Sequence, residues 1–133
     1  MNSIEPEWLS ENEALAIHDR QLTAHGGGVG VRDIGLLQSA MMRPQNAFHY
    51  ERVIALTRLA AAYAFSIIKR PPFVDGNKRT AFVASRTFLI INGFDVVATR
   101  EEKYLTFYAL AEGMLTEEQL AAWFESKVAP INQ

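Results

Sequence analysis

Residues 71–80 read Pro-Pro-Phe-Val-Asp-Gly-Asn-Lys-Arg-Thr, and the rest of the chain is organised around this stretch. The paired prolines and the Asp-Gly pair are turn formers. The apolar run from Ala81 to Ile91 is typical of a buried helix, and Asn77 stands where an N-cap is expected. The stretch therefore predicts a loop that leads into a helix over residues 77–91.

The first turn of this helix carries Lys78 and Arg79, although the helix macrodipole favours acidic side chains there. Two cations, free N–H groups and the close approach that Gly76 allows would suit a phosphate. Asp75 stands where a carboxylate would hold a divalent cation that bridges phosphate oxygens. The alternative is an ordinary Asp-Gly turn followed by a solvated basic pair. From the spacing alone, both interpretations stay open.

Upstream of the loop, apolar residues at three- and four-residue spacing predict a central, mostly buried helix from Glu51 to Lys69. Ser10 and Glu13 have capping-box spacing and predict a first helix that ends near the glycine-rich loop 25–30. A short second helix is expected over residues 33–42, ended by Arg43-Pro44 and followed by a polar connector over residues 45–50.

Downstream, residues 94–98 are the one segment expected to be extended. Thr99 with Glu102, and Thr116 with Gln119, predict two more helix starts. The last helix is expected to bury Leu120, Ala121 and Phe124. The sequence thus predicts an all-α fold, a compact bundle of about six helices, as one domain over residues 1–133.

Composition narrows the class of protein. The chain has 133 residues, 13 basic against 15 acidic, and a net charge of −2, so no bulk attraction to nucleic acid or to a membrane is expected. It contains no cysteine, and no apolar run reaches the roughly 18 residues of a membrane span. The N-terminus lacks the features of a signal peptide. A cytoplasmic location is expected.

Residues 72–80 resemble the signature of the Fic/Doc superfamily, and Lys78 points to its Doc (death-on-curing) branch. Fic enzymes carry glycine at that position and a second arginine at the position of Phe82. The resemblance runs from about Trp8 to Phe124. Further matches are Leu15-Ala16-Ile17-His18-Asp19, His25-Gly26-Gly27, Val31-Arg32-Asp33 with Gly35-Leu36-Leu37, and Arg43-Pro44-Gln45.

This resemblance implies the toxin of a bacterial toxin–antitoxin pair, a kinase that uses ATP and Mg2+ to phosphorylate translation elongation factor Tu and so stops translation. It also implies an antitoxin whose C-terminal segment folds into a helix against the toxin. Two alternatives stay open: a Fic-type nucleotidyl (AMP) transferase, and a catalytically dead antitoxin-binding module. The apolar side chains expected either to receive a partner helix or to pack in the core are Leu36, Met41, Met42 and Phe48.

Carried over by position, the family's signature implies that Asp75 would help to position the magnesium ion. Gly76, Asn77, Lys78 and Arg79 would bind the nucleotide phosphates. Phe73 would anchor the loop in the core. The glycine-rich loop 25–30 would border the edge where the target docks.

The chain departs from the signature at one position. The first residue of the signature is a histidine that acts as general base, and Pro71 stands there instead. Proline cannot accept a proton, so the resemblance implies a toxin that is inactive as given. The three histidines, His18, His25 and His49, are interpreted as ordinary surface or helix-end residues. His25 is the only one expected to merit a test as a substitute base.

Overall fold

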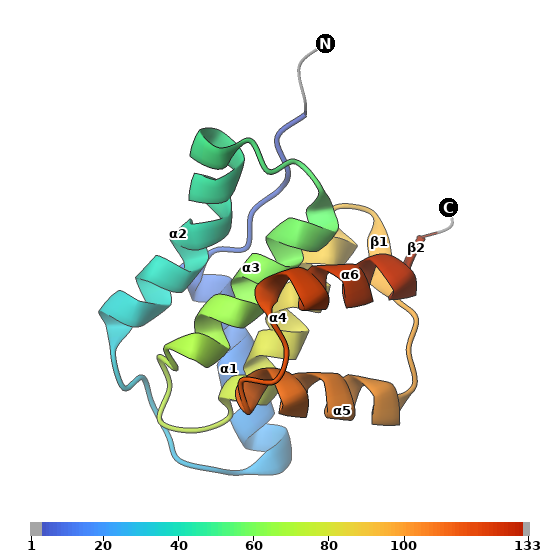
Figure 1. Cartoon of the computed structure of the whole chain (residues 1–133). Helices are drawn as coiled ribbons and strands as arrows, with labels where there is room; N and C mark the ends of the chain where they lie inside the picture. Colours follow the sequence, from blue (N-terminus) through green and yellow to red (C-terminus); the bar gives the residue numbers. More distant parts are fainter. Residues whose placement is uncertain (1–3, 132–133) are drawn as a thin grey trace.

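Two helices, α3 (Leu56–Lys69) and α4 (Asn77–Ile91), pack against each other through the middle of the molecule (Figure 1). The structure is a computed structural model that describes residues 4–131. Tyr63 of α3 and Phe88 of α4 are fully buried, and their ring centroids lie 5.0 Å apart. The loop between these helices is therefore held at both ends by the core.

Four further helices surround this pair. They are α1 (Glu11–His25), α2 (Ile34–Glu51), α5 (Arg100–Ala111) and α6 (Glu117–Lys127). The expected capping boxes are present at the starts of α1, α5 and α6. The all-α fold with six helices is confirmed. Across residues 4–131, no helix is long and apolar enough to cross a membrane.

Helix α2 contradicts the prediction of a short helix that ends at Pro44. It continues through this proline to Glu51, so residues 45–50 are helical rather than a polar connector. Pro44 cannot donate to the carbonyl of Ala40, which normally ends a helix. Here Pro44 is buried on the same face as Ala40 and Ala47. Packing of that face against the core offsets the lost hydrogen bond.

The predicted helix from Glu51 to Lys69 begins five residues later, at Leu56. Arg52 takes a left-handed conformation with φ 57°, and the N–H of Val53 donates to the carbonyl of Ala47. The chain therefore turns at residues 52–55. Val53 is buried within this turn, so the apolar pattern runs on although the helix does not.

The segment expected to be extended contains β1 (Phe94–Val96), and it pairs antiparallel with a second strand, β2 (Val128–Pro130). The sequence prediction missed β2, because its three residues follow α6 directly and lack an alternating pattern of their own. Arg86 of α4 ties this ribbon to the bundle through two bonds to Asp95, of 2.8 and 3.1 Å.

The Arg86–Asp95 pair makes stability depend on pH. The hydrogen bond from Arg86 holds the pKa of Asp95 below its ordinary 3.8. Its contribution is therefore present above that value and is lost as pH falls through the lower pKa of the folded state. We expect Asp95→Asn to cost about 0.5–1 kcal/mol near neutral pH, since the pair is partly exposed, and nothing in strong acid. Urea unfolding over a pH series measures this difference. The exposed Asp19→Asn serves as control.

Candidate functional site

Phe73 and Asn77 hold the loop before α4 in place. Phe73 is 1% exposed and packs in the hydrophobic core. The Asn77 side chain turns back to Phe73, where its oxygen accepts from the backbone N–H and its amide donates to the carbonyl, both at 3.1 Å. The N-cap of α4 is consequently Gly76, with φ 77°, and not Asn77 as expected. The Asn77 side chain is therefore engaged by the loop backbone.

The glycine-rich segment after α1 lies along this loop and is bonded to it through the main chain. The N–H groups of Arg32 and Asp33 donate to the carbonyl of Pro72 at 2.7 and 3.0 Å. The N–H of Val74 donates to the carbonyl of Gly30 at 3.1 Å. The Arg32 guanidinium also donates to the carbonyl of Pro71. Sequence alone left the place of this segment open, because these bonds join residues about 40 positions apart.

Asp75 is exposed and lines the groove described below. Its two oxygens accept hydrogen bonds from the N–H groups of Gly76 at 2.8 Å and Gly28 at 3.4 Å. These bonds, with that of Gly76 the stronger, hold the pKa of Asp75 below its usual value. Within residues 4–131, no three His, Asp or Glu side chains gather into a metal cluster. A single carboxylate such as that of Asp75 could hold Mg2+ only together with phosphate oxygens and water as further ligands.

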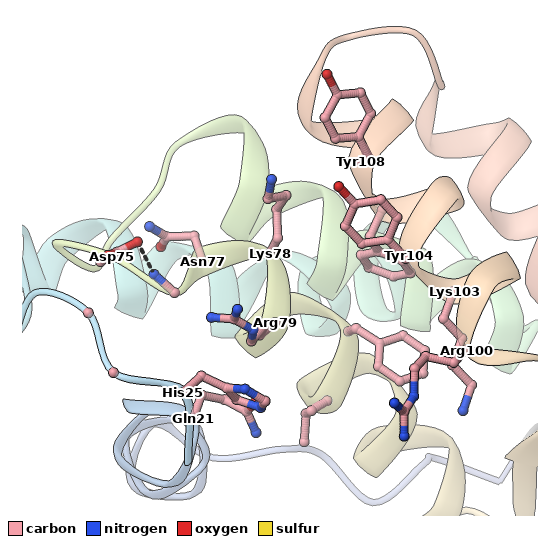
Figure 2. A pocket seen from close by; sticks show the side chains of 16 residues that line it. Gln21, His25, Asp75, Asn77, Lys78, Arg79, Arg100, Lys103, Tyr104 and Tyr108 are labelled. Atoms are coloured by element: carbon pink, nitrogen blue, oxygen red, sulfur yellow. Dashed lines mark hydrogen bonds between the residues drawn. The ribbon is translucent and has the colours of Figure 1, made fainter. Parts of the chain in front are cut away.

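A groove with a cavity of about 950 Å³ opens above α4 (Figure 2). Helix α4 contributes its first turns, the end of α1 and the glycine-rich segment form one side, and α5 forms the other. Its lining includes Gln21, His25, Gly26, Gly27, Asp75, Gly76, Asn77, Lys78, Arg79, Phe82, Val83, Arg100, Lys103, Tyr104, Phe107 and Tyr108.

The charge of this groove is strongly one-sided. Lys78, Arg79, Arg100 and Lys103 line it, and among the described residues Asp75 is the one acidic side chain that does. The chain as a whole carries a net charge of −2, so the charge of the groove is opposite in sign to that of the chain. A groove of one sign draws ligands of the opposite sign. The expected ligand is an anion.

Helix α5 supplies an aromatic wall that the sequence analysis missed. The rings of Tyr104 and Tyr108 lie nearly parallel, with centroids 6.1 Å apart, and the Lys78 ammonium lies 5.4 Å from the Tyr108 ring. Arg100 and Lys103 line the groove from the same helix. Residues 100, 103, 104, 107 and 108 have the three- and four-residue spacing of one helix face. This spacing was the signal in the sequence for the aromatic wall.

The structure brings most of the predicted site residues together. Asp75, Gly76, Asn77, Lys78 and Arg79 line the groove, and Phe73 lies under the loop. Pro71 is half-buried and does not line the groove, although its carbonyl is held by Arg32. Phe82, which stands where Fic enzymes carry a second arginine, is on the groove wall.

The structure agrees with the expectation for some of the histidines and apolar side chains and corrects it for others. His25 and His49 are exposed, but His18 is 2% exposed and was wrongly interpreted as a surface or helix-end residue. Of the apolar side chains considered for receiving a helix, Met41 is buried and Phe48 packs edge-on against Trp8. Core packing accounts for both. Met42 remains exposed, and Leu36 is half-buried.

Gly27 is the position of the glycine-rich segment where a side chain is least tolerable. Its φ is 121°, and an added Cβ would lie 2.8 Å from an Asp75 carboxylate oxygen. We expect Gly27→Ala to cost about 1–3 kcal/mol through backbone strain. We also expect it to displace the carboxylate from the Gly28 N–H and so to raise the pKa of Asp75.

Chemical denaturation and an NMR titration of the Asp75 carboxyl carbon measure these two effects. Gly26→Ala is the matched control, because φ is 76° there and nothing lies within 4 Å of the added Cβ. It should be strained without changing the pKa of Asp75. An unchanged pKa in Gly27→Ala would contradict the placement of the two groups.

The part of the chain that contains the loop and its supporting helices is similar in sequence to known proteins. The Fic/DOC family model matches residues 8–89, from before α1 almost to the end of α4. Toxin Doc from Mycolicibacterium smegmatis (strain ATCC 700084 / mc(2)155) is 47% identical over 95 residues, which cover 69% of each chain. Protein kinase doc from Escherichia phage P1 is 32% identical over 113 residues, 85% of this chain and 89% of the relative. With the loop, its supporting helices and these matches in agreement, the chain belongs to the Fic/DOC family.

Proposed function

We propose that this chain is the toxin of a bacterial toxin–antitoxin pair, built as a Doc-type kinase that transfers the γ-phosphate of ATP to a hydroxyl of elongation factor Tu. The observation that carries the proposal is the groove above α4, where Lys78, Arg79 and Asp75 meet at a helix N-terminus. The relatives named Toxin Doc and Protein kinase doc support the class of activity.

The start of α4 holds the phosphates. The first bond within the helix joins the N–H of Thr80 to the carbonyl of Gly76 at 3.0 Å. The N–H groups of Asn77, Lys78 and Arg79 precede it and are free to donate to phosphate oxygens. The two cationic side chains offset charge that develops during transfer. Bound ATP would supply the phosphoryl group, and Asp75 would hold a magnesium ion that offsets the charge of the phosphate oxygens.

The α5 side of the groove would hold the base of the nucleotide. The rings of Tyr104 and Tyr108 offer flat apolar faces, and each is more than one-third exposed. Stacking of a base on an aromatic side chain is worth about 1–3 kcal/mol. The same groove thus offers cations for the phosphates at one end and a stacking surface at the other.

This site lacks the usual group for removing the proton of the target hydroxyl. Transfer forms a bond from the target hydroxyl oxygen to the γ-phosphorus and breaks the bond to the β–γ bridging oxygen, while the hydroxyl proton needs an acceptor. Pro71 stands at the position of the family's histidine and accepts no proton. The chain is therefore a toxin disabled at one residue, with His25 at the groove edge as the one candidate substitute.

The antitoxin occupies the same groove with its C-terminal helix. Phe82, Val83 and Phe107 give the groove an apolar floor, and the cations around it complement acidic side chains. A helix seated there excludes the nucleotide, which silences the toxin. Acting on elongation factor Tu places the protein in the cytoplasm. A chain that has lost transfer altogether would keep this binding role, which is the second candidate function.

Nucleotide binding tests the proposal directly. We expect calorimetry to detect ATP binding that strengthens when Mg2+ is added. The double variant Lys78→Ala/Arg79→Ala should weaken binding by about tenfold or more, since bonds to charged groups contribute about 1.5–3 kcal/mol each. Lys69→Ala, an exposed cation on α3 outside the groove, should leave affinity unchanged. Absence of ATP binding, or equal affinity in the double variant, would overturn the phosphate site.

A further inference from the structure

His18 is a buried polar side chain that the proposed chemistry does not use. It lies in the middle of α1 and is 2% exposed. Its ring lies flat against the ring of Phe73, with centroids 3.8 Å apart and planes 7° apart. The stack joins α1 to the anchor of the phosphate loop.

The polar edge of the same ring contacts the loop backbone. Its Nε2 lies 2.8 Å from the carbonyl oxygen of Asp75. A carbonyl only accepts, so Nε2 must carry the hydrogen and donate it. An apolar side chain would fill this space equally well but would leave the carbonyl without this bond.

This bond fixes the orientation of one peptide unit. The Asp75 carbonyl and the Gly76 N–H belong to the same trans peptide and point in opposite directions. His18 holds the carbonyl, and the N–H donates to the Asp75 carboxylate at 2.8 Å. Rotation of this peptide would turn the N–H away from the carboxylate and turn the carbonyl away from His18.

We propose that His18 is a positioning residue that locks the Asp75–Gly76 peptide and thereby keeps the Asp75 carboxylate aimed at the cation site. The segment that follows α1 holds the same carboxylate from its other side, through the N–H of Gly28. One element, α1 with its loop, therefore grips Asp75 at both main chain and side chain. The role in magnesium binding rests on the proposed function, whereas the lock itself does not.

Two substitutions separate the hydrogen bond from the stack. His18→Phe keeps a ring against Phe73 and removes the donor. His18→Gln keeps an N–H near the position of Nε2 and removes the ring. Leu120→Ala, a fully buried residue of α6, serves as a control that lowers stability without touching the loop.

The lock is tested first without any ligand. We expect long-range nitrogen–proton NMR spectra to show hydrogen on Nε2 of His18. The amide resonances of Gly76 and Gly28 should shift in His18→Phe, return toward wild type in His18→Gln, and stay in place in Leu120→Ala. A hydrogen on Nδ1 alone, or unshifted amides in His18→Phe, would overturn the proposal even if the protein binds no ATP.

A double-mutant cycle tests whether the lock acts through Asp75. We expect His18→Phe to weaken Mg2+-dependent ATP binding by about tenfold, the effect of losing about 1.4 kcal/mol, and His18→Gln to recover part of it. In an Asp75→Asn background, His18→Phe should cause no further loss, because residues that act as a unit are not additive. Additive losses would assign His18 a packing role only. ATP binding without any Mg2+ dependence would count against the proposed cation site and leave the NMR result standing.

Discussion

The Pro71→His variant is expected to transfer labelled γ-phosphate from ATP to elongation factor Tu about 10²–10⁴ times faster than the chain with proline, the usual contribution of a general base. The backbone at position 71 is prepared for this change, because Arg32 holds its carbonyl and Pro72 keeps it out of helical geometry. The proline ring does not line the groove, and an imidazole at this position reaches further from the backbone than the proline ring does.

Control variants and a second label show whether the faster transfer by Pro71→His comes from a general base. Pro71→Ala removes the ring without adding a base and should stay as slow as the starting chain. Transfer by Pro71→His should rise with pH as the imidazole loses its proton, and Asp75→Asn should abolish the gain. Label that arrives from the α-phosphate would assign nucleotidyl transfer instead. Silence with both labels would favour the antitoxin-binding module.

Phe73→Ala is expected to lower the free energy of unfolding by about 3–5 kcal/mol. The ring is almost fully buried, packs in the main core and stacks on His18, so its removal leaves a cavity where α1 meets the loop. The loop should also lose its fixed geometry, because Asn77 bonds to the backbone of the same residue. Denaturant unfolding measures the loss of stability.

Val74→Ala is the matched control for that experiment. Its side chain is adjacent in sequence but 56% exposed, and its backbone bond to Gly30 does not depend on the side chain. We expect a change within about 0.5 kcal/mol. A loss below about 1 kcal/mol in Phe73→Ala would mean that the loop is not anchored through this ring.

The parts of the fold that were predictable are the parts that depend on local chemistry. Capping boxes at Ser10, Thr99 and Thr116 predicted three helix starts, because each bond joins residues three positions apart. The loop over residues 71–80 and the helix after it followed from turn formers and an apolar run.

The parts that were missed depend on contacts between distant segments. Burial carries α2 through Pro44, and pairing with β1 makes a strand of residues 128–130. His18 looked like a surface residue because nothing nearby in sequence indicates its contact with Asp75, 57 positions away. The helical spacing of the α5 residues that line the groove was visible in the sequence. The contact that brings α5 beside α4 was not.

Three of the bonds that fasten the glycine-rich segment to the loop run between main-chain groups, and the Val74 N–H donates to Gly30 while the Arg32 and Asp33 N–H groups donate to Pro72. Main-chain groups are the same in almost every residue, so this junction tolerates substitution of the side chains that it displays. Val29 and Val74 are 82% and 56% exposed on it. The side chains that this junction presents to other proteins can therefore change without loss of the main-chain bonds that hold the loop.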